Sequence, residues 1–212
     1  LASMRESPPF RAEHVGSLLR TKELLQARND YAQGRITAEE RRCIEDRAVQ
    51  QVVKMQEDVG LQGVTDGELR RGSWHMDFLY QIGGVSTGQD RQQARFHNEN
   101  GDIEFTPTAL HITGKLALQK CIFGEDFEFL KATTIKTPKL TIPAPSLIHY
   151  RGGRASIDRS VYPDVEEFWC DVGRVYAAEV EELGKLGCTY LQLDDTSLAY
   201  LNDPRQREYV TQ

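Results

Sequence analysis

Two segments of the chain share one order of elements, and this repetition constrains the fold more than any other feature of the sequence. In each segment a long amphipathic stretch ends at a glycine, and a short apolar stretch that ends in carboxylates follows. The first segment runs from Thr37 to Glu68 and the second from Tyr162 to Asp195. A helix followed by a strand, repeated along a chain, is typical of parallel α/β proteins.

The first predicted helix has clear signals at both ends. Thr37 and Glu40 have the spacing of a capping box, in which each side chain accepts a hydrogen bond from the backbone N–H of the other residue. Gly60 stands where the left-handed residue that closes a helix is expected. The apolar residues between them recur at helical spacing: Ile44, Ala48, Val52 and Met55. We therefore expect a helix from Thr37 to Val59 and a strand from Leu61 to Thr65.

The second segment repeats this pattern with a stronger apolar stripe. Pro163 and Asp164 open it, and Gly187 ends it. The stripe at helical spacing consists of Val165, Phe168, Trp169, Val172, Val175, Tyr176, Leu183 and Leu186. The stretch from Tyr190 to Leu193 is then predicted to be a strand, and two adjacent aspartates follow it.

Three other stretches are also predicted to be strands, namely Arg11–Val15, Phe105–Thr113 and Lys139–Ile142. About five strands alternating with helices predict an α/β fold, either an open doubly wound sheet or a TIM-type (β/α)8 barrel. Because a complete barrel needs typically ~250 residues, we expect residues 1–212 to be one N-terminal portion of a barrel, about the first five β/α units, with the C-terminal units missing. The polar stretch from Ser86 to Gly101 is expected to be a mobile loop.

Composition argues against several classes of protein. The formal net charge of -6 disfavours a nucleic-acid partner, and no apolar run approaches the ~20 residues that span a membrane. Residues 1–4 lack the apolar core of a signal peptide and are expected to be an appended segment before a start methionine, so a cytoplasmic protein is predicted. The four cysteines have neither disulfide-framework nor zinc-finger spacing: Cys43, Cys121, Cys170 and Cys188.

Polar residues that directly follow predicted strands are the candidates for chemistry, because ligands bind at the carboxyl ends of strands in parallel α/β folds. The first group is His14, Gly16 and Ser17. Gly16 would let a ligand approach the backbone, and the Ser17 hydroxyl and N–H could hold a carboxylate. A Gly-Ser pair after a strand is more often a plain turn.

The second group places acids, bases and an aromatic residue within a few positions after a strand: Asp66, Glu68, Arg70, Arg71 and Trp74. Glu68 could pair with an ammonium group, and Trp74 could form a flat wall of a pocket. A solvated run of charges with a tryptophan in the core explains the same residues equally well.

The third group follows Pro143 and Pro145 and contains His149, Tyr150 and Arg151. These side chains could stack on a planar ligand, although a proline-terminated strand with a polar loop is the commoner arrangement.

The fourth group, Asp194 and Asp195, is the strongest, because burying two adjacent carboxylates is costly unless a cation meets them. Asp195 could instead cap a following helix. Neither a nucleophile–base pair nor a nucleotide-binding motif can be placed in the sequence. No catalytic residue and no metal ligand is therefore assigned.

Three runs together carry a resemblance to a known family: RAEHVGSLLR, GLQGVTDGELRRGSWHMDF and LGCTYLQLDD. Their order and spacing resemble the cobalamin-independent methionine synthases, in particular the short single-barrel members. The resemblance implies a (β/α)8 barrel that transfers a methyl group from a folate-type donor to the thiol of homocysteine and so serves methionine biosynthesis. A zinc ion would keep the sulfur a thiolate, which is sensible because free thiols are mostly protonated at neutral pH.

The resemblance also implies roles for single residues. Gly16 and Ser17 would clamp the carboxylate of the amino acid, Glu68 would meet its amine, and Asp194 would be a second contact to the amino acid. The remaining candidates would be neighbours in the pocket: His14, Asp66, Trp74, Tyr150 and Asp195.

The zinc ligands of the family, a His-x-Cys pair, a Glu and a later Cys, would lie downstream of residue 212. We therefore expect this chain alone to lack tight zinc binding and turnover. Two alternatives stay open. The chain could be a non-catalytic fragment that binds an amino acid or assembles with itself, by swapping or pairing, to cover exposed sheet edges. It could also be a metal-free lyase on the same barrel, which would need a strand-end base with a raised pKa.

Overall fold

The structure is a computed structural model. It describes Pro8, Phe10 and residues 12–91, 94–98, 101–105, 108–150 and 153–211. The chain divides into two compact units. Unit 1 consists of Leu1–Trp74, Phe123–Ile142 and Glu182–Leu193, and unit 2 consists of His75–Ile122, Pro143–Glu181 and Asp194–Gln212.

Parallel strands form the centre of unit 1, as the repeated helix and strand pattern predicts. Strand β1 (Gly63–Val64) pairs in parallel with β6 (Thr137–Pro138). Only Lys139 separates β6 from β7 (Leu140–Pro143), and its N–H donates to the carbonyl of Val64 at 2.8 Å. The segment from β6 to β7 therefore follows β1 along its length.

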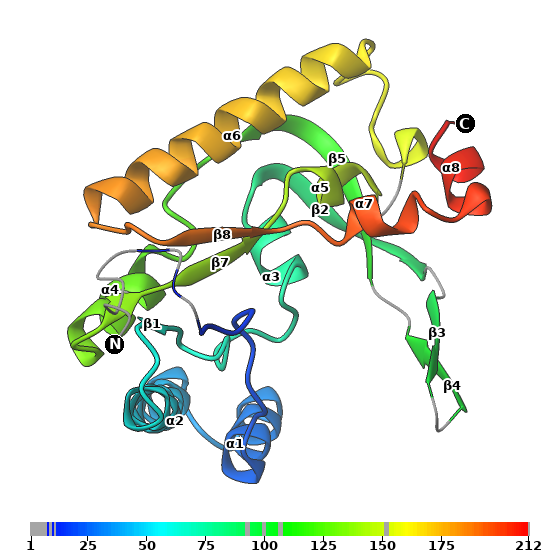
Figure 1. The fold of residues 1–212 in the computed structure, drawn as a ribbon. Coiled ribbons are helices and arrows are strands. Elements are labelled where there is room, and N and C mark those ends of the chain that lie inside the picture. Colours follow the sequence, from blue (N-terminus) through cyan, green and yellow to red (C-terminus); the bar gives the residue numbers. More distant parts are fainter. Residues whose placement is uncertain are drawn as a thin grey trace. The chain divides into compact units, whose positions relative to one another are not determined.

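Strand β8 (Leu191–Asp194) pairs with β7, and Figure 1 shows the two side by side. The N–H of Leu140 donates to Tyr190 and the N–H of Ala144 donates to Asp194, each at 3.0 Å. Because both partners advance along the chain together, β7 and β8 are parallel. Their last residues, Pro143 and Asp194, are counted in unit 2.

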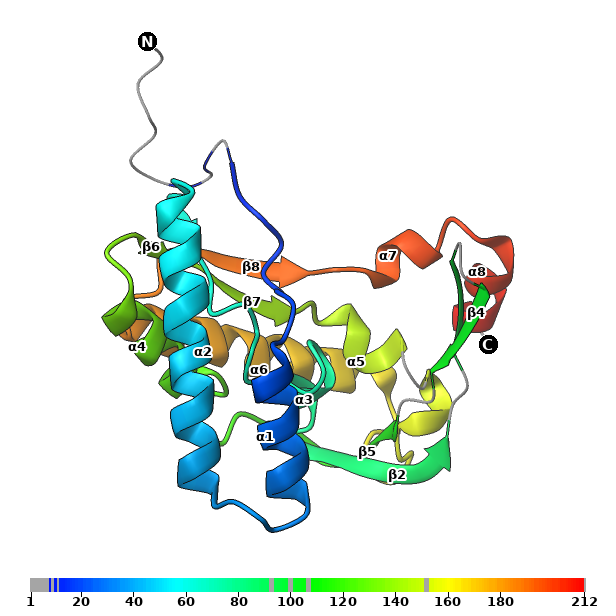
Figure 2. The ribbon, with the colours of Figure 1, turned by 90° about the horizontal axis from the view of Figure 1, so that it is seen from below.

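Three helices of unit 1 are α1 (Lys22–Ala32), α2 (Ala38–Asp58) and α4 (Gly124–Thr133). Figure 2 shows α1 and α2 side by side, and apolar residues from all three helices share one core with residues of β1 and of the turn that follows it. The buried members of this core are Leu24, Ala48, Val49, Val53, Val64, Leu69 and Leu130.

Both ends of α2 confirm the sequence prediction. The Thr37 hydroxyl accepts from the N–H of Glu40 at 3.1 Å, and the Glu40 carboxylate accepts from the N–H of Thr37 at 2.7 Å. Gly60 follows the helix with a φ of 88°, a left-handed conformation that costs little only for glycine.

Unit 2 contains two antiparallel strand pairs, β2 (Gly83–Arg91) with β5 (Thr108–Ala117) and β3 (Ala94–Asn98) with β4 (Gly101–Phe105). Its helical elements are α3 (Met76–Leu79), α5 (Ser146–Tyr150), the 3₁₀ helix η1 (Arg154–Ser156), most of α6 (Val165–Lys185), α7 (Ser197–Tyr200) and α8 (Pro204–Thr211). Tyr162 ties β5 to α6, because its hydroxyl accepts from the N–H of Leu116 and donates to Asp171, both at 2.7 Å.

Several sequence predictions were wrong. Ser86–Gly101 was expected to be a loop, yet β2 runs to Arg91 and β3 follows, because antiparallel pairing of backbones needs no apolar alternation. No element was predicted near the end of the sequence, where α8 forms from Pro204 to Thr211. The strand predicted over Phe105–Thr113 begins at Thr108 and continues to Ala117.

The predicted strand Arg11–Val15 is also wrong over residues 12–15, which have no strand partner; Arg11 lies outside the described residues. Side chains hold this segment instead. Lys139 donates to the carbonyl of His14 at 2.8 Å, and Gln192 donates to the carbonyl of Val15 at 3.0 Å.

No helix within the described ranges has the length and the apolar composition that a membrane span requires.

Candidate functional site

The tight turn that follows β1 has an unusual backbone. Gly67 and Glu68 have φ values of 67° and 54°, and Glu68 is the one non-glycine residue with positive φ in the part of the chain that the structure describes. This conformation costs an ordinary residue about 1–2 kcal/mol. Asp66 offsets part of that cost, because its carboxylate accepts from the N–H of Glu68 at 2.8 Å. Strained residues of this kind cluster at functional sites.

Hydrogen bonds join this turn to the segment that contains Gly16. The Thr65 hydroxyl donates to the carbonyl of Gly16 at 2.8 Å and accepts from the N–H of Gly67 at 3.0 Å. In return, the N–H of Leu18 donates to the carbonyl of Gly67 at 2.9 Å. The two chain segments that carry the first and second groups of candidates are therefore fixed against each other.

The carboxylate of Glu68 is buried, with 2% of the residue exposed, and lies beside Thr141 of β7. Oε1 of Glu68 accepts from the Thr141 hydroxyl at 2.8 Å, and Nη1 of Arg71 lies 3.7 Å from the same oxygen. Nη2 of Arg71 donates to the backbone carbonyl of Thr141 at 2.7 Å. Glu68 thus lies in the turn that follows the carboxyl end of β1 and contacts Thr141 within β7. Ligands bind beyond the carboxyl ends of strands in parallel α/β folds.

Gly16 packs directly on this group. A Cβ atom at Gly16 would lie 2.8 Å from Cγ2 of Thr141 and 3.0 Å from Oε1 of Glu68, so no larger residue fits without displacing one of them. Gly16 is buried and the next residue, Ser17, is exposed. The structure therefore places Gly16 beside Glu68, although the strand predicted before Gly16 does not form. The roles of Gly16, Ser17 and Glu68 in binding stay a prediction.

The other candidates of unit 1 have structural contacts. His14 is half-buried, and its Nε2 lies 2.7 Å from Oε1 of Gln56, an amide that also accepts from the N–H of Thr65. Asp66 stabilises the turn as described above. Trp74 is half-buried, and its carbonyl accepts from Arg71 at 3.4 Å. Asp66 and Trp74 lie near Glu68 in sequence, and His14 reaches the turn only through Gln56. The role of all three as pocket neighbours stays a prediction.

Arg70, from the same charged run, belongs to a separate ion-pair network. Its guanidinium lies 2.8 Å from Asp46 and 3.1 Å from Asp126, and its Cζ lies 4.7 Å from the ring centre of Phe129. Burial raises the pKa of Asp126 despite the nearby arginines. This network links α2, the turn and α4, which indicates a structural role for Arg70.

The remaining candidates lie in unit 2. Asp195 is exposed, and its Oδ1 accepts from the hydroxyls of Ser197 at 2.8 Å and Ser146 at 3.3 Å and from the N–H of Leu198 at 3.3 Å. Burial alone would raise the pKa of Asp195, but these hydrogen bonds outweigh it and lower the pKa. The bond to Leu198 satisfies an N–H in the first turn of α7, but the N-cap position of this helix is held by Thr196 and not by Asp195.

Asp194 and Tyr150 are half-buried, at the ends of β8 and α5. The predicted role of Asp194 as an amino-acid contact stays a prediction. His149 packs on aromatic rings of α6, with centroid distances of 6.2 Å to Phe168 and 5.3 Å to Trp169. Arg151, the last member of its group, lies outside the described residues.

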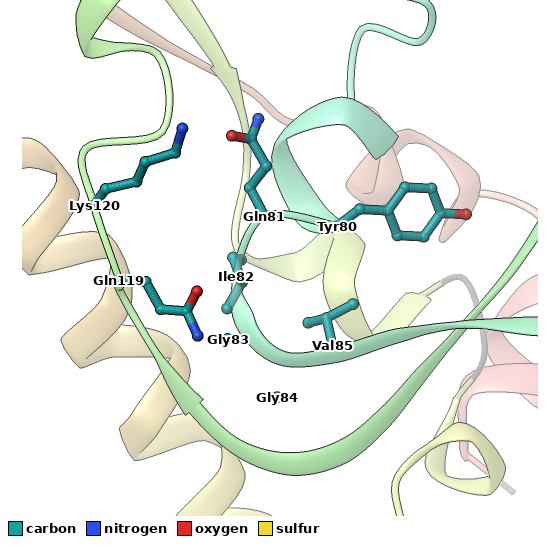
Figure 3. Close-up of a pocket in the computed structure, with 8 residues that line it drawn as sticks. All are labelled: Tyr80, Gln81, Ile82, Gly83, Gly84, Val85, Gln119 and Lys120. Carbon is teal, nitrogen blue, oxygen red and sulfur yellow. The ribbon is translucent and has the colours of Figure 1, made fainter.

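Unit 2 also contains an open hollow of about 420 Å³ beside the start of β2 (Figure 3). Gly83 and Gly84 line it together with Gln119 and Lys120. None of the residues predicted from the sequence lines this hollow.

Sequence reasoning missed Thr141 and gave Arg71 no role. Thr141 lies in the middle of an apolar strand, and only its contact with Glu68, 73 positions away in sequence, distinguishes it. Among the described residues, no three histidine, cysteine, aspartate or glutamate side chains lie together in a group that could hold a metal ion.

Comparisons with known proteins agree with the resemblance seen in the sequence, although no family model matches the chain. YxjH of Bacillus subtilis (strain 168), an uncharacterized protein, is 39% identical over 203 residues, which cover 95% of this chain and 52% of YxjH. A 5-methyltetrahydropteroyltriglutamate–homocysteine methyltransferase of Candida albicans is 23% identical over 192 residues, which cover 90% of this chain and 24% of that protein.

A crystal structure from Listeria monocytogenes, described provisionally as a vitamin-B12-independent methionine synthase, has a TM-score of 0.78 and 38% identity. The match covers 94% of this chain and 56% of the Listeria chain. The chain spans about half the length of YxjH and of the Listeria protein. The Listeria protein shares the α/β fold of this chain, and the chain is similar to proteins of the cobalamin-independent methionine synthase type.

Proposed function

We propose that this chain binds the amino-acid part of homocysteine, or of a close analogue, for transfer of a methyl group from a folate-type donor to the thiol. The observation that carries the proposal is the buried carboxylate of Glu68, held in the left-handed turn after β1 and in contact with Thr141 of β7 and with Gly16. The name of the Candida albicans relative supports the reaction, because it states both the methyl donor and the acceptor.

The geometry suits a zwitterionic amino acid. Its ammonium group would pair with Glu68, because a buried carboxylate gains most from a cation that also donates hydrogen bonds. Its carboxylate would meet the N–H groups and the hydroxyl of Gly16 and Ser17. Arg71 already forms a buried ion pair with Glu68, its Nη1 lying 3.7 Å from Oε1, so the ammonium group would be a second cation at this carboxylate.

In the reaction, the thiolate sulfur forms a bond to the methyl carbon while the bond from that carbon to the donor nitrogen breaks, and the nitrogen then takes up a proton. Glu68, Gly16 and Ser17 would bind and orient the acceptor for this step. Zinc activates the thiol in the family that the chain resembles. The described residues do not fit a zinc ion, so we derive no step through zinc from them.

The same proposal includes the architecture, a portion of a (β/α)8 barrel. Three helices each precede a parallel strand segment of the sheet, α2 before β1, α4 before β6 and β7, and α6 before β8. This order supports a portion of a (β/α)8 barrel, in which strand-end residues form the ligand site.

Isothermal titration calorimetry with L-homocysteine and with L-methionine tests the proposal. We expect the chain to bind both, and we expect Glu68→Gln to weaken binding at least about tenfold, the effect of losing a hydrogen bond to a charged group. Glu39→Gln is the matched control, because Glu39 is an exposed residue in the first turn of α2. Failure of the unaltered chain to bind either amino acid, or equal binding by Glu68→Gln, would contradict the proposal.

A further inference from the structure

A directional chain of hydrogen bonds runs from Arg71 through Thr141 to Glu68. Nη1 of Arg71 lies 3.4 Å from the Thr141 hydroxyl, and this hydroxyl lies 2.8 Å from Oε1 of Glu68. A guanidinium only donates and an ionised carboxylate only accepts. The hydroxyl therefore accepts from Arg71 and gives its single proton to Glu68.

Arg71 is fixed by its other contacts. Only 3% of the residue is exposed, and Nη2 donates to the carbonyl of Thr141 at 2.7 Å. Nη1 also reaches the carbonyl of Trp74 at 3.4 Å, and Cζ lies 4.2 Å from the ring centre of Phe123. A guanidinium held on these sides has little freedom to turn, so the hydroxyl that it orients is held as well.

Both branches of Thr141 lie close to Gly16, and only the hydroxyl also bonds Glu68. Cγ2 lies 2.8 Å and Oγ1 3.2 Å from the position that a Cβ of Gly16 would take. Valine would keep the methyl contact and lose the hydrogen bond. Serine would keep the hydrogen bond and lose the methyl contact.

We propose that Thr141 is a positioning residue that fixes the plane of the Glu68 carboxylate and so makes the site selective for ligands with a primary amine. The inference rests on the proposed function. A carboxylate that is already oriented loses less entropy when an ammonium group binds, which is the usual gain from preorganisation. A ligand without the amine gains nothing from this orientation, so its affinity does not depend on the hydroxyl.

Calorimetry of Thr141→Val and Thr141→Ser with two ligands tests this. The ligands are L-methionine and 4-(methylsulfanyl)butanoate, which is methionine without its amine. We expect Thr141→Val to bind L-methionine about tenfold more weakly, the loss of one hydrogen bond to a charged group, and to bind the desamino ligand unchanged. Thr141→Ser should restore most of the affinity for L-methionine.

Thr133→Val is the control, because Thr133 is a half-buried threonine whose hydroxyl donates to the carbonyl of Phe129 at 2.8 Å, within α4. If Thr141→Val does not fold, Thr141→Cys replaces it, since a thiol is a weak donor. Unchanged affinity for L-methionine, or an equal loss for both ligands, would overturn the inference while leaving the proposed function intact. A wild-type chain that does not bind L-methionine would overturn both.

Discussion

At the scale of single residues, Glu68 has an unfavourable backbone conformation that hydrogen bonds from its neighbours help to stabilise. Its φ of 54° is unfavourable for a side chain with a Cβ, yet Asp66 accepts from its N–H and Thr141 donates to its carboxylate. Gly16 completes the arrangement because it has no Cβ to displace them. These contacts hold the buried carboxylate in a backbone conformation that a residue other than glycine rarely adopts.

Gly16→Ala tests this close packing. The new Cβ would lie 2.8 Å from Thr141 and 3.0 Å from Glu68, so we expect the free energy of unfolding to fall by about 1–3 kcal/mol, as for other overpacked sites. Binding of L-methionine should fall with it. Urea unfolding and calorimetry measure the two effects.

Gly173→Ala is the matched control for that change. Gly173 is exposed within α6, and a Cβ there would meet nothing within 4 Å. Alanine in the interior of a helix is favoured over glycine by about 0.5–1 kcal/mol, so this variant should gain stability. Similar effects of both substitutions would contradict the packing described for Gly16.

Candidate residues could be predicted only where the sequence carries a local signal. Glu68 follows a predicted strand that forms, whereas the strand predicted before Gly16 does not form, and the two residues nevertheless lie in contact. Thr141 could not be predicted, because its partner in the site is 73 positions away and a threonine in a strand has no distinguishing pattern. Two roles were predicted for Asp195 from its position after a strand. It accepts a hydrogen bond from Leu198 in the first turn of α7, although Thr196 holds the N-cap position.

At the scale of elements, the capping box at the start of α2 is a local contribution to stability. The Thr37 and Glu40 side chains each accept from the backbone of the other. We expect Thr37→Ala to lower the free energy of unfolding by about 1 kcal/mol, measured by urea denaturation. Gln50→Ala, at an exposed position within the same helix, should change it by less than about 0.5 kcal/mol. Equal changes in the free energy of unfolding for the two variants would show that the capping box does not stabilise the protein.

The packing of α5 on α6 predicts a pH dependence. Burial, followed by the charge of Arg154, lowers the pKa of His149 below its ordinary value. The unfolded chain therefore binds a proton at a higher pH than the folded chain does. The stability that His149 contributes is present above about pH 6.5, the pKa of an exposed histidine, and is lost as the pH falls towards the folded pKa.

Urea midpoints measured between pH 7.5 and pH 5, a range chosen around about 6.5, test this for the wild type and for His149→Gln. We expect the wild type to lose more stability than the variant as the pH falls. Parallel curves for the two proteins would show that His149 titrates alike in both states.

The long helices were predicted well because caps and apolar stripes are local. Ala38–Asp58 and Val165–Lys185 lie where the spacing placed them. The antiparallel strands β2 and β3 were missed, since pairing between backbones leaves little trace in a polar sequence. Side chains rather than a strand hold residues 12–15, which no periodicity could indicate.

For the molecule as a whole, the order of helices and parallel strands was the part of the fold that the sequence determined best. The α/β fold follows from two repeated segments, and the relatives share it. The pairing of β1 with β6 and of β7 with β8 depends on contacts between distant segments. The barrel and the reaction are proposals for the longer protein, because the chain spans about half the length of these relatives.

The central claim is that Glu68 binds the amine of an amino acid whose carboxylate meets Gly16 and Ser17. A crystal structure of the chain with L-methionine tests it most directly. We predict the ammonium nitrogen within hydrogen-bonding distance, about 2.7–3.2 Å, of the Glu68 carboxylate, and the ligand carboxylate at the backbone of Gly16 and Ser17. Methionine bound elsewhere, or bound with its amine turned away from Glu68, would contradict the account.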